Sequence, residues 1–385
     1  MKKALMNASV ASMIYKFNMD NIEILESLGY QVDVACNFGK ENPITLQQID
    51  KFREILNEKG INVYETDCPR SVLAIGKMIK TYKLLKKIID EGDYDLIHTQ
   101  SPIGGVICRL AARKARKNGT KVIYTAHGFH FYKGAPKKYW ILFYPIEKMC
   151  SKYTDVLITI NKEDYTLALQ KMKAKETVYV PGVGVDRNKF AICKVDIKEK
   201  RDNLNISEDK TWLLNVGELT TRKNQELLIK AIKEFPNVYL TIAGQGELKK
   251  KLLSLIQELN IEDRVKLLGY RTDIHELCEA CDVFAFPSFQ EGLSVALMEA
   301  MACGKPVICS KIRGNVDLID ENGGELFDPY DLNELKTALT KILNRNLNEM
   351  GIYNSQKIKK FDLAVVADEM KNIYYTDSKS SRVGN

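Results

Sequence analysis

Residues 289–302 read Phe-Gln-Glu-Gly-Leu-Ser-Val-Ala-Leu-Met-Glu-Ala-Met-Ala, and this stretch decides the predicted fold. An apolar run at 283–287 precedes it and a second apolar run at 305–309 follows it. Short apolar runs on either side of a helical pattern are typical of a βαβ unit, whose two strands are buried and parallel. The sequence therefore predicts a turn and a helix here, beginning where a buried strand ends.

The chemistry of this turn suits a ligand that carries both phosphates and hydroxyls. Gly292 leaves room for a ligand near the backbone, and Ser294 can cap the helix while its first N–H groups face an anion. Glu291 and Glu299 lie eight residues apart, and their carboxylates can accept hydrogen bonds from sugar hydroxyls. We expect a pocket in which the amides bind phosphates and the carboxylates bind hydroxyls.

Length and composition indicate a soluble protein of two domains. A chain of 385 residues is longer than one hydrophobic core usually serves. The hydrophobic fraction of 45% and the mean hydropathy of −0.24 are ordinary for a globular protein. The sequence has no apolar run of the roughly 18 residues that a membrane span needs. The apolar N-terminus is interrupted at Asn7 and has no clear cleavage site, so we expect a cytoplasmic protein.

The nine cysteines are odd in number and scattered, mostly within apolar stretches. This distribution indicates reduced, buried thiols in a cytosolic protein. Cys278 and Cys281 form a lone C-x-x-C without a second pair, so a buried helix face explains them better than a metal or redox site. We expect no metal site.

The formal net charge of +7 comes entirely from the first half of the chain. Residues 1–185 hold 28 Lys and Arg against 19 Asp and Glu, whereas residues 186–385 hold 29 against 31. The excess is either an ordinary solvated surface or a surface that attracts an anionic membrane leaflet or acceptor, and the sequence leaves both open. Nucleic acid is a poorer partner, since we find no stacking motif or groove-binding helix pattern.

Alternating strand and helix patterns fill the first half and predict a parallel sheet. The loop 9–16 after the first strand lacks glycine, so it is not a dinucleotide fingerprint and no nicotinamide cofactor is expected. A Lys-rich amphipathic helix is predicted over 73–89, and its cationic face is either solvated or applied to a membrane. The predicted strands cover 3–10, 31–36, 60–64, 96–98, 122–125 and 155–160, and the other helices cover 17–28 and 106–115.

The loop 126–136 is the strongest candidate site of the first half. It follows a predicted strand and holds His127 and His130 among Gly and aromatic residues, with Lys133 close by. Ligands of open α/β sheets bind at the carboxyl ends of strands, so two His in this place favour a site over a structural role. The basic and aromatic stretch 137–144 either touches lipid headgroups or packs as a helix.

The alternation restarts near residue 210, which places a domain crossing at the Gly-rich turn 181–186. The segment 190–209 is charged and shows little periodicity, so we expect a linker and other chain at the protein surface. The next predicted strand ends at Gly217, and the loop beyond it carries Arg222 and Lys223, which could reach a diphosphate.

Two more glycine loops follow predicted strands of the second half. Gly244 and Gly246 form a G-x-G turn, which is weak evidence by itself. The backbone after Gly269, next to Tyr270, could bind the edge of a nucleobase. Amphipathic helices are predicted over 332–343 and 361–375, and the polar tail beyond them is expected to be disordered.

Together these motifs resemble glycosyltransferase family 4. The strand, the turn with Glu291 and the helix with Glu299 resemble its E-x7-E motif, and the loops at Gly217, Gly244 and Gly269 follow in the order of that family. The resemblance covers nearly the whole chain. The loop 126–136, with Phe17-Asn18 and Asn37-Phe38, resembles a bacterial subgroup that builds capsule or exopolysaccharide repeat units.

The resemblance implies an α/β fold of the GT-B type, with two Rossmann-like domains that face each other across a cleft. Residues 1–185 would form an acceptor-binding domain and residues 186–360 a domain that binds the nucleotide sugar. Residues 361–376 would form a helix that returns to the first domain, and residues 377–385 a disordered tail.

The resemblance also implies roles for single residues. Lys223 would hold the diphosphate, Glu291 the donor-sugar hydroxyls and Glu299 the ribose, and His127 would contact the donor sugar near the reacting centre. One position departs from the family, because Glu218 stands where the family often has Arg, so Arg222 would replace that Arg or Lys223 and the helix dipole would suffice. The implied catalytic residues are Glu291, His127 and Lys223; the implied donor contacts are Arg222, Gly217, Glu299, Gly292, Leu293, Ser294, Gly269 and Tyr270; and the implied acceptor side is His130, Lys133 and Ser9.

The activity implied is transfer of a hexose or N-acetylhexosamine from a nucleotide sugar, expected to be UDP-linked, with retention at the anomeric carbon. No cofactor and no obligatory metal are implied. The acceptor would be a sugar on undecaprenyl diphosphate or a similar lipid, used by a peripheral protein at the inner face of an anionic membrane. Two alternatives remain open, a nucleotide-sugar epimerase or hydrolase of the same fold and a non-catalytic partner subunit.

Overall fold

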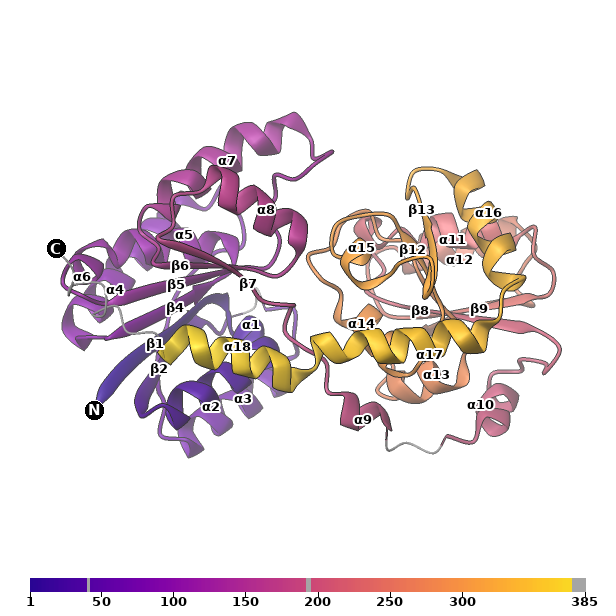
Figure 1. The fold of residues 1–385 in the computed structure, drawn as a ribbon, viewed down its shortest axis with the longest axis horizontal. Helices are drawn as coiled ribbons and strands as arrows, with labels where there is room; N and C mark the ends of the chain where they lie inside the picture. Colours follow the sequence, from indigo (N-terminus) through magenta and orange to yellow (C-terminus); the bar gives the residue numbers. More distant parts are fainter. Residues whose placement is uncertain (40–41, 192–194, 376–385) are drawn as a thin grey trace. The chain divides into compact units, whose positions relative to one another are not determined.

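The computed structural model of the chain describes residues 1–39, 42–191 and 195–375. The chain divides into two compact units (Figure 1). The first unit comprises Met1–Val183 together with the chain from Val366 on, and the second comprises Gly184–Val365. The expected tail 377–385 lies outside the described residues.

The first unit is built on a seven-stranded parallel sheet with the order β3-β2-β1-β4-β5-β6-β7. The order reverses between β1 and β4, and such a switch point leaves a crevice at the carboxyl ends of the strands where ligands bind. The strands are β1 (Lys2–Val10), β2 (Tyr30–Asn37), β3 (Asn62–Glu65), β4 (Leu96–Gln100), β5 (Lys121–Ala126), β6 (Val156–Thr159) and β7 (Glu176–Tyr179).

Helices cover both faces of this sheet, which is why its central strands are apolar on both sides. Ala4, Met6 and Ala8 of β1 belong to one core cluster, whereas Leu5 belongs to a cluster on the opposite face. The helices are α1 (Ala11–Phe17), α2 (Met19–Ser27), α3 (Leu46–Glu58), α4 (Ile75–Gly92), α5 (Pro102–Ala111), α6 (Arg113–Lys117), α7 (Lys137–Ser151) and α8 (Lys162–Lys171).

The second unit repeats this plan with a six-stranded parallel sheet, in the order β10-β9-β8-β11-β12-β13. Its switch point lies between β8 and β11, the two strands that lead into the loops at Gly217 and Glu291. The strands are β8 (Thr211–Val216), β9 (Val238–Ala243), β10 (Val265–Gly269), β11 (Val283–Phe286), β12 (Val307–Ser310) and β13 (Gly324–Phe327).

The helices of the second unit likewise cover both sheet faces, which hold separate core clusters. They are α9 (Arg187–Ala191), α10 (Ile197–Asn203), the 3-10 helix η1 (Thr221–Lys223), α11 (Gln225–Ile232), α12 (Lys249–Glu258), α13 (Ile274–Ala280), α14 (Val295–Ala302), α15 (Asn315–Leu318), α16 (Leu332–Leu343), α17 (Leu347–Lys357) and the 3-10 helix η2 (Ile358–Phe361).

The last helix, α18 (Leu363–Tyr375), packs into the core of the first unit. Tyr374 is 1% exposed, and its hydroxyl lies 2.7 Å from Nδ1 of the buried His98. The other ring nitrogen of His98 contacts Thr125 at 2.8 Å, and burial lowers the pKa of this imidazole to about 3. The ammonium of Lys121 donates to the carbonyl of Ile373 and satisfies one of the last carbonyls of the helix.

Two expectations about local structure were wrong, and one helix was not predicted. The segment 9–16 is not a loop, because α1 begins directly after β1 and uses the apolar residues that follow. The segment 190–209 is not simply a linker, because it contains helix α10. Asp196 caps this helix, and Arg201 donates a hydrogen bond to the carboxylate of Asp282. The helix α17 went unrecognised, because its apolar pattern is weak and buried Asn354 holds it by bonds to the carbonyls of Lys305 and Gly323.

Among the described residues, none of the helices is both long enough and apolar enough to cross a lipid bilayer. The described cysteines are all free and buried.

A buried ion pair joins α5 to α7. The guanidinium of Arg109, which is 0% exposed, donates two hydrogen bonds to the Glu147 carboxylate, at 2.6 and 3.1 Å. It also donates through Nε to the carbonyl of Gly105 and lies 3.7 Å from the ring centre of Tyr124. The two charges compensate each other, so the pair is tolerated where α5 and α7 face the sheet.

We predict that Glu147→Ala lowers the free energy of unfolding of the first unit by about 3–5 kcal/mol, because it leaves Arg109 buried without its partner. Urea unfolding measures the change. The control is Asp90→Ala, which removes the exposed i,i+4 partner of Lys86 in α4 and should cost about 0.3–0.5 kcal/mol. Equal losses in the two variants would contradict the structural role of the buried pair.

Candidate active site

The turn between β11 and α14 lies against the loop that follows β8. The backbone N–H of Phe289 donates to the carbonyl of Arg222 at 2.9 Å, which joins the two loops. Ser294 caps α14 by accepting from the N–H of Leu297 at 3.4 Å, as the sequence predicted. The cap occupies one N–H group and leaves others of the first turn unused by the helix.

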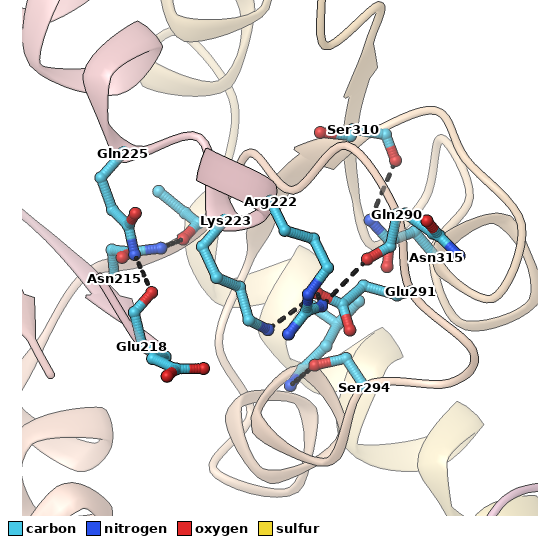
Figure 2. A network of polar contacts seen from close by, with 12 residues as sticks. Asn215, Glu218, Arg222, Lys223, Gln225, Gln290, Glu291, Ser294, Ser310 and Asn315 are labelled. Carbon is cyan, nitrogen blue, oxygen red and sulfur yellow. Dashed lines mark hydrogen bonds and ion pairs between the residues drawn. The ribbon is translucent and has the colours of Figure 1, made fainter. Parts of the chain in front are cut away.

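Glu291 holds two cations at one oxygen atom. Its Oε1 accepts from Nζ of Lys223 at 2.7 Å and from Nη1 of Arg222 at 2.8 Å (Figure 2). Arg222 also donates to the carbonyl of Gln290 at 3.0 Å. The side chains of Glu291 and Lys223 are 10% and 13% exposed, whereas that of Arg222 is 46% exposed. The structure thus brings three predicted site residues together as one ionic cluster.

Burial acts on the charge of Lys223. The ammonium lies 4.6 Å from the ring centre of Phe286, and burial lowers its pKa below the ordinary value even though the Glu291 carboxylate opposes this. A partly desolvated cation gains more from an anionic partner than one in bulk water does. Lys223 is therefore suited to an anion that enters the site.

Side-chain amides fix the loops around this cluster (Figure 2). Asn215 donates to the carbonyl of Ala285 at 2.8 Å and joins the ends of β8 and β11. Asn315 donates to the carbonyl of Ser310 at 3.0 Å, and Gln225 donates to the carbonyl of Glu218 at 3.1 Å. Because these amides hold main-chain atoms, they position backbone groups of the loops.

Close backbone approach explains Gly244 and Gly246 of the second unit. A Cβ atom on Gly244 would lie 1.9 Å from the carbonyl oxygen of Gly217, and one on Gly246 would lie 2.4 Å from that of Leu219. The N–H of Gly244 donates to the carbonyl of Gly269 at 2.8 Å. The three glycine loops named in the sequence therefore lie side by side, backbone against backbone.

A second close approach supports the turn of Glu291. A Cβ atom on Gly314, whose φ is +77°, would lie 2.2 Å from the carbonyl oxygen of Gly292. Arg313 is buried and donates through Nε to the carbonyl of Glu291 at 3.2 Å. Arg313 was not predicted as a site residue, although its place in a polar loop directly after β12 was a usable signal.

Glu299 lies in the second turn of α14 and is partly buried. Burial raises the pKa of its carboxyl group, and Lys189 opposes this.

Tyr270 follows Gly269 and is 66% exposed. The backbone of Leu293 lies in the same turn as Gly292, where a Cβ atom on Gly314 would also approach the Cα of Leu293 at 3.4 Å.

The first unit holds the other predicted site residues. His127 follows β5, and its Nε2 lies 2.5 Å from Oε1 of Gln100 at the end of β4. The amide of Gln100 in turn donates to Oδ1 of Asn18. Burial lowers the pKa of His127 to about 4, so the ring is neutral near pH 7. Since an amide oxygen only accepts, the proton is on Nε2 and Nδ1 is left as an acceptor.

Gln100 and Asn18 are functional candidates that the sequence analysis missed. Both are 1% exposed and polar, and Gln100 ends a strand next to the switch point. A polar residue at that point of a central strand was a usable signal for Gln100.

The three residues expected on the acceptor side have different surroundings. Ser9 is buried, and its hydroxyl accepts from the N–H of Gly104 at 2.9 Å and from the hydroxyl of Ser101. The ring of His130 lies 4.7 Å from that of Phe143. Lys133 is exposed, and its backbone N–H donates to Glu163 at 2.8 Å. Ser9 thus joins the end of β1 to the start of α5, and Lys133 keeps its side chain at the surface.

Two doubly wound parallel sheets, with a carboxylate and cation cluster at the strand ends of the second, define a glycosyltransferase of the GT-B class. The chain belongs to the family 4-like glycosyltransferases. Residues 196–358 match the family described as "Glycosyl transferases group 1", and residues 7–161 match the family described as "Glycosyl transferase 4-like".

Curated relatives match along nearly the full length. The EpsD protein of Bacillus subtilis (strain 168) is 35% identical over 383 residues, which cover 97% of this chain and 96% of the relative. The UDP-Gal:alpha-D-GlcNAc-diphosphoundecaprenol alpha-1,3-galactosyltransferase of Escherichia coli is 31% identical over 379 residues, with coverages of 94% and 93%. The expectation of a glycosyltransferase enzyme is confirmed.

A solved structure agrees in fold. Anabaena HepE in complex with UDP and glucose has a TM-score of 0.76 at 21% identity, and the match covers 97% of this chain and 99% of that one. The expected GT-B fold class is confirmed.

We predict that Gly246→Ala lowers stability by about 1–3 kcal/mol, because the new Cβ forces the backbone of Leu219 away. The control is Gly217→Ala, where the nearest atom belongs to the flexible side chain of Lys223 at 3.4 Å. Calorimetric unfolding compares the two variants. A Gly217→Ala loss as large as that of Gly246→Ala would contradict the backbone contact.

Proposed function

We propose that the protein transfers a hexose or N-acetylhexosamine from a UDP-linked donor to a sugar carried on undecaprenyl diphosphate or a similar lipid. The observation that carries this proposal is the cluster of Lys223, Arg222 and Glu291 at the strand ends of the second unit. It offers two cations for a diphosphate and one carboxylate for sugar hydroxyls. The name of the Escherichia coli relative supports the donor and the lipid acceptor.

We further propose that transfer retains the anomeric configuration. The bond between the anomeric carbon and the diphosphate oxygen breaks, and the electron pair stays on that oxygen. Lys223 and Arg222 stabilise the negative charge where it develops. The acceptor hydroxyl attacks from the same face, its oxygen bonds to the anomeric carbon, and its proton passes to the departing phosphate. In this proposal no metal or other cofactor takes part.

In the proposed mechanism His127 serves as a hydrogen-bond acceptor. Its neutral ring, with the proton held on Nε2 by Gln100, offers Nδ1 to a hydroxyl of the donor sugar. Gln100 and Asn18 act as positioning residues, because they set the tautomer and the orientation of the ring.

Glu299 is proposed to hold the ribose, and Tyr270 with the backbone at Gly269 is proposed to lie at the nucleobase. The product would be a lipid-linked repeat unit of a capsular or extracellular polysaccharide, made at the inner face of an anionic membrane. The basic excess of residues 1–185 supports this location.

The proposal predicts activity in a donor screen. UDP-linked hexoses and N-acetylhexosamines are incubated with and without a lipid-linked sugar acceptor, and the anomeric configuration of the product is read by NMR. We expect a new retained linkage only when the acceptor is present, and a loss of at least about a hundredfold in Glu291→Ala. Hydrolysis alone would favour a hydrolase, and an inverted product would overturn retention.

A second prediction concerns the competition for the two cations. In the structure the Glu291 carboxylate already pairs with Lys223 and Arg222, so a diphosphate competes with it for the charge of these cations. Glu291→Gln should abolish transfer but bind UDP roughly 3–10-fold more tightly, because an opposing charge is removed. Lys223→Ala should weaken UDP binding by about 10-fold or more.

Isothermal titration calorimetry measures both dissociation constants. The matched control is Glu218→Gln, which removes an exposed carboxylate near the same cations and should change the affinity less than about twofold. Weaker UDP binding by Glu291→Gln would refute the competition.

A further inference from the structure

Exposed aliphatic side chains gather in two places in the first unit. Val72, Leu73, Ile75 and Ile79 lie at the start of α4 and are 44–86% exposed. Ile141 and Leu142 lie near the start of α7 and are 76% and 49% exposed. We call these six residues the aliphatic rim. Large apolar side chains exposed in groups mark an interaction surface.

The two parts of the aliphatic rim lie on the same side of the sheet. Helix α5 packs against both α4 and α7 (Figure 1). The sheet residues beneath the two parts of the rim also share one face. Ile97 of β4 is paired with Val122 of β5, and Tyr124 lies two residues after Val122 in β5, so the three side chains point to the same side of the sheet.

The aliphatic rim also lies at one edge of that sheet. Helix α4 connects the parallel strands β3 and β4, and α7 connects β5 and β6, so both helices begin at the carboxyl edge and run back. The first turns of both helices therefore lie at the edge where β1 ends near Ser9 and where His127 follows β5. This is the edge of the expected acceptor side.

The charge around the aliphatic rim is mainly positive, with Asp67 paired to Lys80 beside it. Residues 68–89 contain six Lys or Arg and no Asp or Glu, and residues 126–146 contain three Lys and no Asp or Glu. Lys77, Lys83, Lys137 and Lys138 are exposed. Aliphatic side chains ringed by cations suit the interface of an anionic bilayer, where the apolar groups enter the acyl boundary and the cations meet the headgroups.

We propose that the first unit docks on an anionic membrane through the aliphatic rim and the lysines around it. The carboxyl edge of its sheet then faces the lipid surface, and the acceptor-side residues lie next to the headgroups. The choice of a bilayer over another apolar partner rests on the charge and, in part, on the proposed lipid-linked acceptor.

The test uses the full chain and lipid vesicles. Flotation compares vesicles of phosphatidylglycerol and phosphatidylcholine (1:3) with vesicles of phosphatidylcholine alone. We expect binding to the anionic vesicles that falls at least about tenfold in the double variants Leu73→Ser/Ile75→Ser and Ile141→Ser/Leu142→Ser. The control is Leu253→Ser/Ile352→Ser, which removes aliphatic side chains of the second unit that are 42% and 55% exposed.

The outcomes separate this proposal from the proposed function. Unchanged vesicle binding in the two rim variants, or equal binding to both kinds of vesicle, would overturn the docking surface. If the rim variants change only the oligomeric state measured by light scattering, the aliphatic rim contacts a second copy of the chain. That result would also overturn the proposed membrane docking. UDP affinity should stay unchanged in the rim variants, so failed transfer with intact vesicle binding would speak against the proposed reaction alone.

Discussion

The double ion pair at Oε1 of Glu291 is the interaction on which the candidate site depends. It connects the loop after β8 to the turn after β11, the two strands at the switch point of the second sheet. The backbone bond between Phe289 and Arg222 and the buried Arg313 hold the same turn from two sides. Before any ligand enters, this one carboxylate compensates part of the charge of the buried Lys223 ammonium and the more exposed Arg222 guanidinium.

Much of the fold could be predicted from the sequence, because a buried parallel strand is a continuous apolar run and a surface helix has an apolar stripe. Helix α16 begins and ends where the periodicity does, at residues 332 and 343. Helix α17 could not be found in this way, since buried Asn354 anchors it by bonds to backbone carbonyls. The helix in the segment 9–16 was also missed. A loop was expected after the first strand, whereas α1 begins at the residue that directly follows β1.

The same limit applies to the site. Glu291 and Glu299 follow from a motif with fixed spacing, whereas Lys223 and the glycine loops follow from their places after predicted strands and from the family resemblance. The contacts of His127 with Gln100, and of Gln100 with Asn18, join residues from three separate segments, so no spacing in the sequence reveals them. Likewise, the pairing of Glu291 with both cations depends on how two loops meet, which periodicity does not encode.

The contact between Tyr374 and His98 has a consequence for synthesis. The core of the first unit includes Val366, Met370, Ile373 and Tyr374, which are among the last described residues of the chain. A ribosome makes residues 1–183 and then the whole second unit before these side chains emerge. The first unit therefore keeps part of its apolar core uncovered until residues 366–374 have been made, after the second unit.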